Sequence, residues 1–597
     1  MRLQEYWGIG PKTAELLEAE LGAERAIEAI ESADIRTLSD AGVSRGRATR
    51  ILRRATGAAG LDLLGTGDTR DVYDDLLGLA AEEALTAHAA DRIRVLTPLE
   101  GQEAAGTRLD RVDGAVDAWT ALDDEERESV IAAFDRYDEA DESRRAAVET
   151  ARSLRTVGIG ETAADGGTFA RLAAVDTTAL SEAADALGAV EGGFIGEDGV
   201  GEGALTVGAG ADESLDSQRA ELAAARRLDD AALDVLETVR GQGVRSLEEF
   251  QGAVIEYVAT ETGVGAGEVR AAAPDRARDE TDFVTATLRS LVGELESNVA
   301  DREAAVAGEL REAIQAAGDD VAAAVDAVDE LAFELSLARF AVAHKLRRPE
   351  LVSDGLAVRG ARNLFIGEGV QPVNYGVGEH SISRTDGPTP PSGDRVTVLT
   401  GANSGGKTTL LETLCQVALL ASMGLPVPAA AAEVGEFDTV VFHRRHASFN
   451  AGVLESTLRS VVPPLTGGGR TLMLVDEFEA ITEPGRAADL LNGLVDLTVD
   501  RGALGVFVTH LADDLSPLPA SARIDGIFAE GLTDELALRV DYQPRFGTVG
   551  KSTPEFIVSR LVANASDRDE REAFRAIAAA VGEEAVQRTL SDAEWEA

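Results

Sequence analysis

Residues 395–412 read Arg395-Val-Thr-Val-Leu-Thr-Gly-Ala-Asn-Ser-Gly-Gly-Lys-Thr-Thr-Leu-Leu-Glu412, and this stretch decides the fold of the region around it. Its first part is a β-branched apolar run, which predicts a strand, and its last part predicts a helix. Between them stands Gly-x-x-x-x-Gly-Lys-Thr, residues 401–408. A chance glycine turn is the alternative, but four matched positions between a strand and a helix favour a phosphate-binding loop.

The chemistry of such a loop gives each residue type a role. Glycines let backbone N–H groups surround a polyphosphate, and the N-terminus of the next helix adds its positive end. We expect Lys407 to contact the β- and γ-phosphates and the Thr408 hydroxyl to bind Mg²⁺. ATP and Mg²⁺ are therefore the expected cofactors. The expected nucleotide-binding residues are Gly401, Asn403, Gly405, Gly406, Lys407, Thr408 and Thr409.

Two later apolar runs end in residues that complete a hydrolytic site. Thr471-Leu-Met-Leu-Val-Asp476-Glu477 predicts a strand ending in two carboxylates, Asp476 for Mg²⁺ and Glu477 to polarise the attacking water. Gly505-Val-Phe-Val-Thr-His510 predicts a third strand, with His510 sensing the γ-phosphate. Solvated acids and a structural histidine are the plainer alternatives. The paired Asp-Glu with a strand-end His argues against most P-loop kinases and favours an ABC-type ATPase.

Composition limits the remaining possibilities. The chain has 597 residues, which predicts three or four domains, and a net charge of −50 with only four lysines: Lys12, Lys345, Lys407 and Lys551. Because the acid is spread along the chain, a solvated carboxylate coat of the halophilic kind is favoured over an acidic binding face. With a single cysteine and no apolar run of membrane-spanning length, we expect a cytoplasmic protein without a membrane partner.

The N-terminal residues 1–57 carry two related patterns about 34 residues apart. Gly8-Ile-Gly10-Pro-Lys12-Thr-Ala14 resembles the helix-hairpin-helix motif of DNA-binding proteins, and residues 42–48 form a degenerate second copy. In such a hairpin, backbone amides hold a DNA phosphate without reading sequence. The alternative is a small helical packing module with a solvated arginine face. The expected DNA contacts are Gly8, Gly10, Lys12, Arg45, Arg47 and Arg50.

The rest of the chain divides by texture. Residues 58–190 predict a helical connector, a glycine-rich loop or small hairpin follows at 192–210, and 191–350 predict long helices, the last of them stopping at Pro349. Residues 351–565 predict the α/β P-loop domain, and 566–597 a charged helical tail. The predicted fold class is multidomain, with α-helical N-terminal regions followed by an α/β ABC-type P-loop ATPase domain.

Several segments resemble the MutS mismatch-repair family. Residues 400–409 are similar to its loop Thr-Gly-Pro-Asn-x-Gly-Gly-Lys-Ser-Thr, with Ala402 for Pro and Thr408 for Ser. Residues 421–435 look like the family's segment after the loop helix, and 476–484 are close to the Asp-Glu-x-x-x-x-Thr-Asp-Pro form of short MutS relatives. Residues 446–455 resemble the Ser/Thr-Phe segment that reaches a partner's ATP. The resemblance implies that Ser448 completes the nucleotide site of a second subunit in a homodimer, and that 191–350 are lever and clamp helices.

Two departures shape the functional expectation. No Phe-x-Glu wedge for intercalation at a mismatch and no small nuclease domain is readable, so we expect a short branch without the mismatch-reading domain. The resemblance implies a DNA-stimulated ATPase that switches its grip on double-stranded or branched DNA in repair or recombination, with a nuclease as a possible partner. An ATP-stabilised structural clamp and an SMC-like chromosomal ATPase are the alternatives. The DNA structure, the pathway and the oligomer beyond a dimer stay open.

Overall fold

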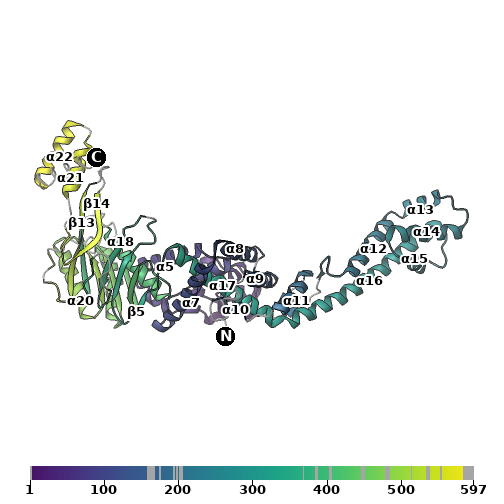
Figure 1. The fold of residues 1–597 in the computed structure, drawn as a ribbon, viewed down its shortest axis with the longest axis horizontal. Helices are drawn as coiled ribbons and strands as arrows, with labels where there is room; N and C mark the ends of the chain where they lie inside the picture. The colour runs from purple at the N-terminus through teal and green to yellow at the C-terminus, as the bar shows by residue number, and fades with distance from the viewer. Residues whose placement is uncertain are drawn as a thin grey trace. The chain divides into compact units, whose positions relative to one another are not determined.

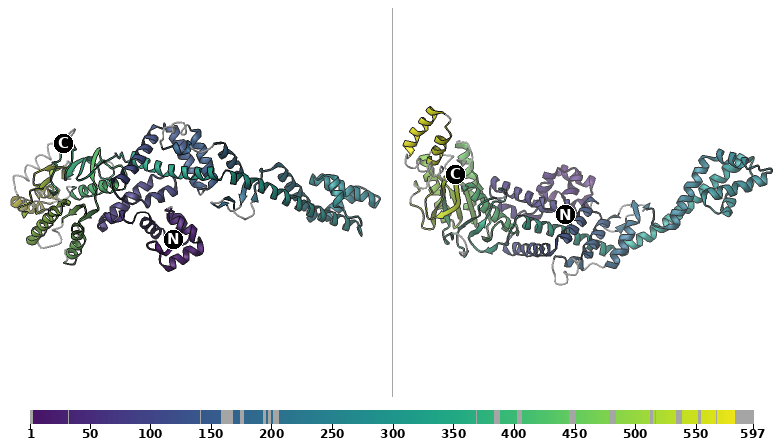
Figure 2. Two further views of the ribbon diagram at one scale, coloured as in Figure 1. Left: turned by 90° about the horizontal axis from the view of Figure 1, so that it is seen from below. Right: turned by 45° about the horizontal axis from the view of Figure 1, so that its top comes forward.

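The computed structural model (Figures 1 and 2) forms two compact units, one made of Met1–Ile131 with Asp329–Ala597, the other of Ala132–Val328. Their limits differ from the predicted domain boundaries, because residues 58–131 pack on the P-loop domain through a shared core. The residues described are 3–31, 33–140, 142–157, 168–173, 177–192, 195–196, 199–200, 206–367, 369–382, 388–401, 406–444, 451–477, 484–511, 514–515, 517–532, 538–550, 554–565 and 567–581.

The first unit begins with a small helical bundle. Its elements are η1 (Leu3–Glu5), α1 (Pro11–Glu20), α2 (Ala23–Glu31), α3 (Ile35–Asp40) and α4 (Arg45–Gly57). Apolar residues at helical spacing, among them Leu17, Ile30 and Leu52, are fully buried in one core of this bundle. The bundle is attached to the helices after it through Val95, which belongs to the same core, and through a hydrogen bond from Arg53 to the Arg94 carbonyl.

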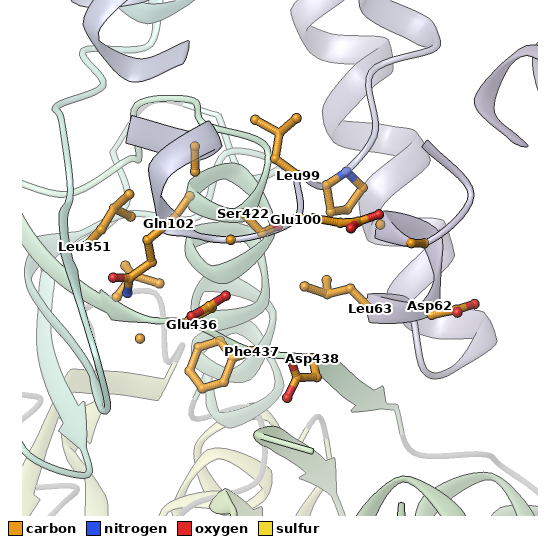
Figure 3. Close-up of a pocket in the computed structure, with 18 residues that line it drawn as sticks. Asp62, Leu63, Leu99, Glu100, Gln102, Leu351, Ser422, Glu436, Phe437 and Asp438 are labelled. Atoms are coloured by element: carbon orange, nitrogen blue, oxygen red, sulfur yellow. The ribbon is translucent and has the colours of Figure 1, made fainter. Parts of the chain in front are cut away.

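A helical layer then leads into the P-loop domain. It consists of η2 (Gly60–Leu63), α5 (Gly67–Glu82), α6 (Ala87–Arg94) and α7 (Gln102–Ala121). At the start of α5, Thr69 Oγ1 donates to the Val440 carbonyl at 3.1 Å and accepts from the Phe442 amide at 2.9 Å. A cavity of about 420 Å³ lies between η2, residues 98–102 and the segment 434–438, and Figure 3 shows Asp62, Glu100, Glu436 and Asp438 around it.

The P-loop domain is built on a six-stranded sheet with the order β10-β11-β12-β8-β13-β14. The strands are β8 (Val396–Gly401), β10 (Thr439–His443), β11 (Thr471–Asp476), β12 (Leu504–Val508), β13 (Ala522–Leu532) and β14 (Leu538–Phe546), and only β14 pairs antiparallel. Helix α18 (Lys407–Ser422) shares a core with one face, where Leu399 and Leu474 lie. Helices α19 (Ala451–Thr466) and α20 (Pro484–Asp500) share the other, with Val398 and Val475.

A second, four-stranded sheet has the order β5-β9-β6-β7. Its strands are β5 (Glu350–Val352), β6 (Leu356–Ala361), β7 (Val373–Val377) and β9 (Ala431–Gly435). The chain then continues beyond β14 into α21 (Pro554–Asn564) and α22 (Arg568–Val581), and α22 lies in the described part of the expected helical tail.

The second unit is helical, as expected. It contains α9 (Arg144–Thr156), α10 (Ala170–Ala173), α11 (Thr177–Gly188), α12 (Glu213–Asp230), α13 (Ala232–Gly241), α14 (Leu247–Thr262), α15 (Ala266–Ala272) and the 37-residue α16 (Glu280–Ala316). The glycine-rich segment forms small antiparallel pairs, β1 (Val190–Gly192) with β4 (Thr206–Val207) and β2 (Ile195–Gly196) with β3 (Gly199–Val200). Helices α8 (Asp124–Glu139) and α17 (Gly318–Ala343) run across the unit limits. No helix in the described part of the chain is both long and apolar enough to cross a membrane.

One predicted helix end is wrong. The sequence predicts that the helix stops at Pro349, but α17 ends at Ala343 and Lys345 is left-handed, with φ +53°. The reason is tertiary: the Arg347 amide donates to the Val427 carbonyl at 2.9 Å, and the Val427 amide donates back at 2.8 Å. This antiparallel bridge requires an extended backbone, so the helix ends before the proline requires it.

Candidate nucleotide site and nucleic-acid interface

The predicted phosphate-binding loop leaves β8 at Gly401 and enters α18 at Lys407, as the strand–loop–helix pattern requires. Gly401 has φ +132°, and a Cβ there would lie 2.2 Å from the Ile527 carbonyl oxygen. Gly406 has φ +75°, and a Cβ there would lie 2.7 Å from the Tyr542 ring. Both positions therefore need glycine. Asn403 and Gly405 lie outside the described residues.

Lys407, Thr408 and Asp476 come together at the ends of β8 and β11. The Lys407 ammonium donates to the Gly401 carbonyl at 3.0 Å, across the mouth of the loop, and its side chain is buried. The Thr408 hydroxyl donates to Asp476 Oδ2 at 2.6 Å, although the two residues are 68 positions apart. This places a cation, a hydroxyl and a carboxylate at one edge of the sheet.

Glu477 and His510 form the second half of the site. His510 Nε2 lies 2.7 Å from Glu477 Oε1, and the Glu477 amide donates to the Val508 carbonyl at 3.1 Å. Glu477 has φ +41°, which a non-glycine residue rarely adopts. The sheet order explains the contact: β12 lies between β8 and β11, so its C-terminal end places Thr509 and His510 beside both other strands.

A cavity of about 480 Å³ opens beside Lys407 and Thr408. Its other walls include residues that the sequence patterns did not indicate: Asn363, Ile366, Val370, Gln371 and Tyr542. Asn363 Nδ2 donates to Glu412 Oε2 at 2.9 Å, and Gln371 Nε2 donates to Asp541 Oδ1 at 2.9 Å. Ile366 and Tyr542 are about half-exposed apolar side chains next to the loop. This volume and lining are of the kind that holds a nucleotide's base and ribose.

The residues fit ATP and Mg²⁺. Hard oxygen donors suit Mg²⁺, and the Thr408 hydroxyl and Asp476 carboxylate are two such donors within one hydrogen bond of each other. Thr409 lies in the first turn of α18, at the cavity wall. A bound ion would supply positive charge at the developing phosphoryl oxygens.

A buried pair, Arg523 with Asp525, lies next to the residue that precedes the loop. The Thr400 hydroxyl donates to the Asp525 carbonyl at 3.0 Å, and Arg523 Nε lies 3.0 Å from Asp525 Oδ2. Burial raises the pKa of the Asp525 carboxyl above its ordinary value, against the opposing effect of Arg523. Burial likewise raises the pKa of the Cys415 thiol on α18, which makes this thiol a core group rather than a nucleophile.

Ser448 lies outside the described residues, in the segment 445–450 that precedes α19.

The two N-terminal hairpins have the same local structure. Gly8 and Gly42 have φ +81° and +91°, and the residues two positions on, Gly10 and Ser44, are extended N-caps of α1 and α4. Ile9 and Val43 are buried alike, as are Ala14 and Ala48. The packing is reciprocal: Gly8 faces Ile51 of α4, and Gly42 faces Leu16 of α1. The pair forms one pseudo-symmetric module, with Gly8, Gly10, Lys12, Arg45, Arg47 and Arg50 exposed.

Some arginines of this module have structural partners. Arg45 pairs with Asp91, and Arg47 Nη2 donates to the Gly8 carbonyl at 3.1 Å, which joins the two hairpins. Arg53 pairs with Asp74 at 2.6 Å and lies over the Tyr73 ring. Lys12 and Arg50 form no ion pair with a described carboxylate, so these two are the clearest candidates for phosphate contact.

Comparison with known proteins finds relatives named MutS2 and MutS. The chain is 46% identical over 214 residues to the DNA-binding protein MutS2 of Pyrococcus furiosus, covering 36% of this chain and 37% of the relative. It is 28% identical over 385 residues to the endonuclease MutS2 of Thermomicrobium roseum (58% and 46%) and 31% identical over 235 residues to the DNA mismatch repair protein MutS of Nitrobacter hamburgensis (38% and 24%). The chain thus spans less than half the length of each of these relatives. No family model matches it.

These similarities and the strand-end cluster of Lys407, Thr408 and Asp476 lead to one conclusion. The chain is a member of the MutS family, of its short, MutS2-like branch.

Proposed function

We propose that this protein is a DNA-binding ATPase that hydrolyses ATP at the β8–β11–β12 edge in DNA repair or recombination. The carrying observation is the geometry of two pairs, Thr408 with Asp476 at 2.6 Å and Glu477 with His510 at 2.7 Å, at one edge of the sheet. The names of the relatives, a DNA-binding protein, an endonuclease and a mismatch repair protein, support the DNA part.

Each residue has a defined task in this mechanism. Lys407 and the N-terminus of α18 hold the β- and γ-phosphates, and Asp476 orients the Thr408 hydroxyl toward the ion. Glu477 accepts the proton of the attacking water, and His510 fixes the orientation of that carboxylate through their hydrogen bond. Mg²⁺, when bound, supplies positive charge at the phosphoryl oxygens.

We further propose that two copies form composite sites, with Ser448 of each reaching the other's nucleotide, and that closure changes the grip on DNA. This part rests on the resemblance of residues 446–455 to the family's segment. Cytoplasmic location and adaptation to high salt are proposals of the same kind, resting on composition alone.

The substitution Glu477→Gln tests hydrolysis. We expect it to lower kcat by about 10²–10⁴-fold, the usual contribution of a general base, while a fluorescent ATP analogue still binds. Lys407→Ala is the matched comparison and is expected to lose nucleotide binding itself. Steady-state ATPase assays in molar salt, with and without DNA, measure both. Full turnover by the Glu477→Gln variant would contradict the mechanism, and negligible turnover by the unaltered protein would favour the structural-clamp alternative.

The double substitution Lys12→Glu with Arg50→Glu tests the hairpins as a DNA surface. Each lost phosphate contact is expected to reduce the slope of log K against log salt by about 0.9, with about tenfold weaker binding of blunt duplex. Arg25→Glu, on the exposed side of α2 in the same bundle, is the control for each of the two charge reversals made singly. Equal affinities and slopes for the double variant and the unaltered chain would rule out this surface.

A further inference from the structure

A second cleft, of about 560 Å³, separates the hairpin module from the P-loop domain. Its walls come from three places in the first unit: Trp7 and Arg54 of the hairpin module, Arg70 of α5, and Arg459 with Pro464 of α19. No catalytic residue described above lines it, and the nucleotide cavity is lined by a different set of residues.

The cleft concentrates positive charge in an acidic chain. Five arginines line it, at positions 50, 53, 54, 70 and 459, against two carboxylates, Asp62 and Asp74. Arg53 is committed to Asp74, and Arg459 lies 2.7 Å from Glu455 on its own exposed helix face. Arg50, Arg54 and Arg70 form no ion pair with a described carboxylate, although acidic residues outnumber basic ones by 106 to 56 in the whole chain. The cleft is therefore suited to an anion.

An aromatic side chain stands at the same cleft. Trp7 is 57% exposed, and the Arg54 guanidinium lies 5.0 Å from the centre of its ring. Indole rings and guanidinium planes are the surfaces on which proteins stack unpaired bases, and such stacking tolerates any base. An anion with a planar base is thus favoured over a simple anion.

Size and position narrow the choice further. The volume lies in the range of pockets that hold one small organic molecule, which admits one or two nucleotides but no turn of duplex. Arg50 lines the cleft and belongs to α4, whose N-terminus is the second hairpin. We propose that this cleft binds a single-stranded segment of DNA that leaves the duplex held by the two hairpins. The inference rests on the proposed DNA binding and refines it to branched or tailed DNA.

The cleft is also lined by α19 of the P-loop domain, close to the segment that is expected to contact a second subunit. Arg459 and Ser460 lie on α19, the helix that begins directly after residues 445–450, where Ser448 is expected to meet the partner's nucleotide. A single-stranded DNA segment in the cleft would contact α19. A single-stranded tail is therefore expected to change the ATPase rate more than blunt duplex does.

The experiment compares the full-length protein on blunt duplex and on the same duplex with a ten-nucleotide oligothymidine tail, by fluorescence anisotropy. The tail is expected to raise affinity at least about fivefold, the lower end for one stacked base. Trp7→Ala and the double variant Arg70→Ala with Arg459→Ala should each lose this gain and keep blunt-duplex affinity. Arg486→Ala is the control, because Arg486 is 80% exposed and pairs along its own helix as Arg459 does.

Each outcome of this comparison supports or overturns the proposed DNA site. Equal affinity for tailed and blunt duplex, or a gain that survives Trp7→Ala, overturns the cleft assignment. A free nucleotide is the other source of the same chemistry, so thymidine monophosphate is titrated separately: if it binds with quenching of Trp7 fluorescence while the tail adds nothing, the cleft is a nucleotide site and the DNA assignment fails. If the unaltered protein binds neither duplex, the proposed DNA-binding function itself is refuted.

Discussion

Glu477 carries the strain of the nucleotide site in its backbone. A left-handed non-glycine residue costs on the order of 1–3 kcal/mol and persists only where the surroundings fix it. Here the fixing contacts are the hydrogen bond of its amide to Val508 and the His510 contact at its carboxylate. The two neighbouring carboxylates thus have different partners: Glu477 contacts His510, which follows β12, and Asp476 accepts from Thr408.

Glu330 shows how single charges hold the helical layer to α17. Its carboxylate lies 2.5 Å from Arg92 and also contacts Arg111, which in turn binds Glu334 at 2.8 Å. Burial by itself would raise the pKa of Glu330, but Arg92 and then Arg111 outweigh it, so the pKa lies below its ordinary value of 4.5.

The substitution Glu330→Gln should therefore lower Tm by about 2–4 °C at pH 7, as the loss of one charge-assisted pair predicts. Because the folded pKa is depressed, the stabilisation by Glu330 is present above pH 4.5 and is lost as pH falls through the folded pKa. The difference in Tm should therefore be retained when thermal unfolding is repeated at pH 5, and it should shrink at pH 4 and pH 3. Glu15→Gln on exposed α1 is the control, and a difference that grows on acidification would contradict the assignment.

Local patterns could predict which residues meet at the strand ends but not the residues that line the neighbouring cavity. Lys407, Asp476 and His510 each follow an apolar run, and parallel strands bring such ends to one edge. Ile366 and Tyr542 reach the same cavity from a loop and an edge strand, far before and after the phosphate-binding loop. No local pattern connects those segments, because β7–β14 contact is decided by tertiary packing.

At the scale of elements, the same limit applies to α17 and to the domain limits. Hydrophobic spacing predicts that a helix exists, but the Arg347–Val427 bridge decides where this one ends. Residues 58–190 are predicted as a helical connector or core, and in the structure Leu76 and Leu77 share a core with Leu411 and Leu414 of α18. A helix's apolar face can be read from sequence, whereas its partner cannot.

The close contact between η2 and the backbone of Pro98 requires a glycine at position 60. A Cβ at Gly60 would lie 1.8 Å from the Pro98 carbonyl oxygen, which is backbone and cannot rotate away. Gly60→Ala should therefore destabilise the first unit by about 1–3 kcal/mol, as overpacking does. Gly67→Ala is the matched control: a Cβ at Gly67, in the first turn of α5, meets nothing within 4 Å. Differential scanning calorimetry of both variants measures the effect, and an unchanged Gly60→Ala protein would show that the segment 96–101 yields.

At the scale of the whole molecule, exposed positive charge gathers in one region of a chain that is acidic elsewhere. Carboxylates dominate the chain, while the exposed basic residues of the first 57 positions and the neighbouring cleft form a local exception. In concentrated salt the release of counterions from DNA contributes little, so phosphate contacts alone bind weakly. Base stacking at Trp7 would retain its strength there, which makes the proposed cleft more important as salt rises.

The outer edge of β10 has a further consequence, which concerns aggregation. No strand of the described sheet pairs with that edge; Gly65, Thr66 and Thr69 of the preceding segment occupy its backbone groups instead. An uncovered edge strand is a template for pairing with other chains. A shortened protein of residues 351–565 should therefore self-associate, as seen by size-exclusion chromatography with light scattering, whereas one that also keeps residues 58–131 should not. The segment before α5 and the start of that helix thus cover the β10 edge, so removing them would leave its backbone groups open to another chain.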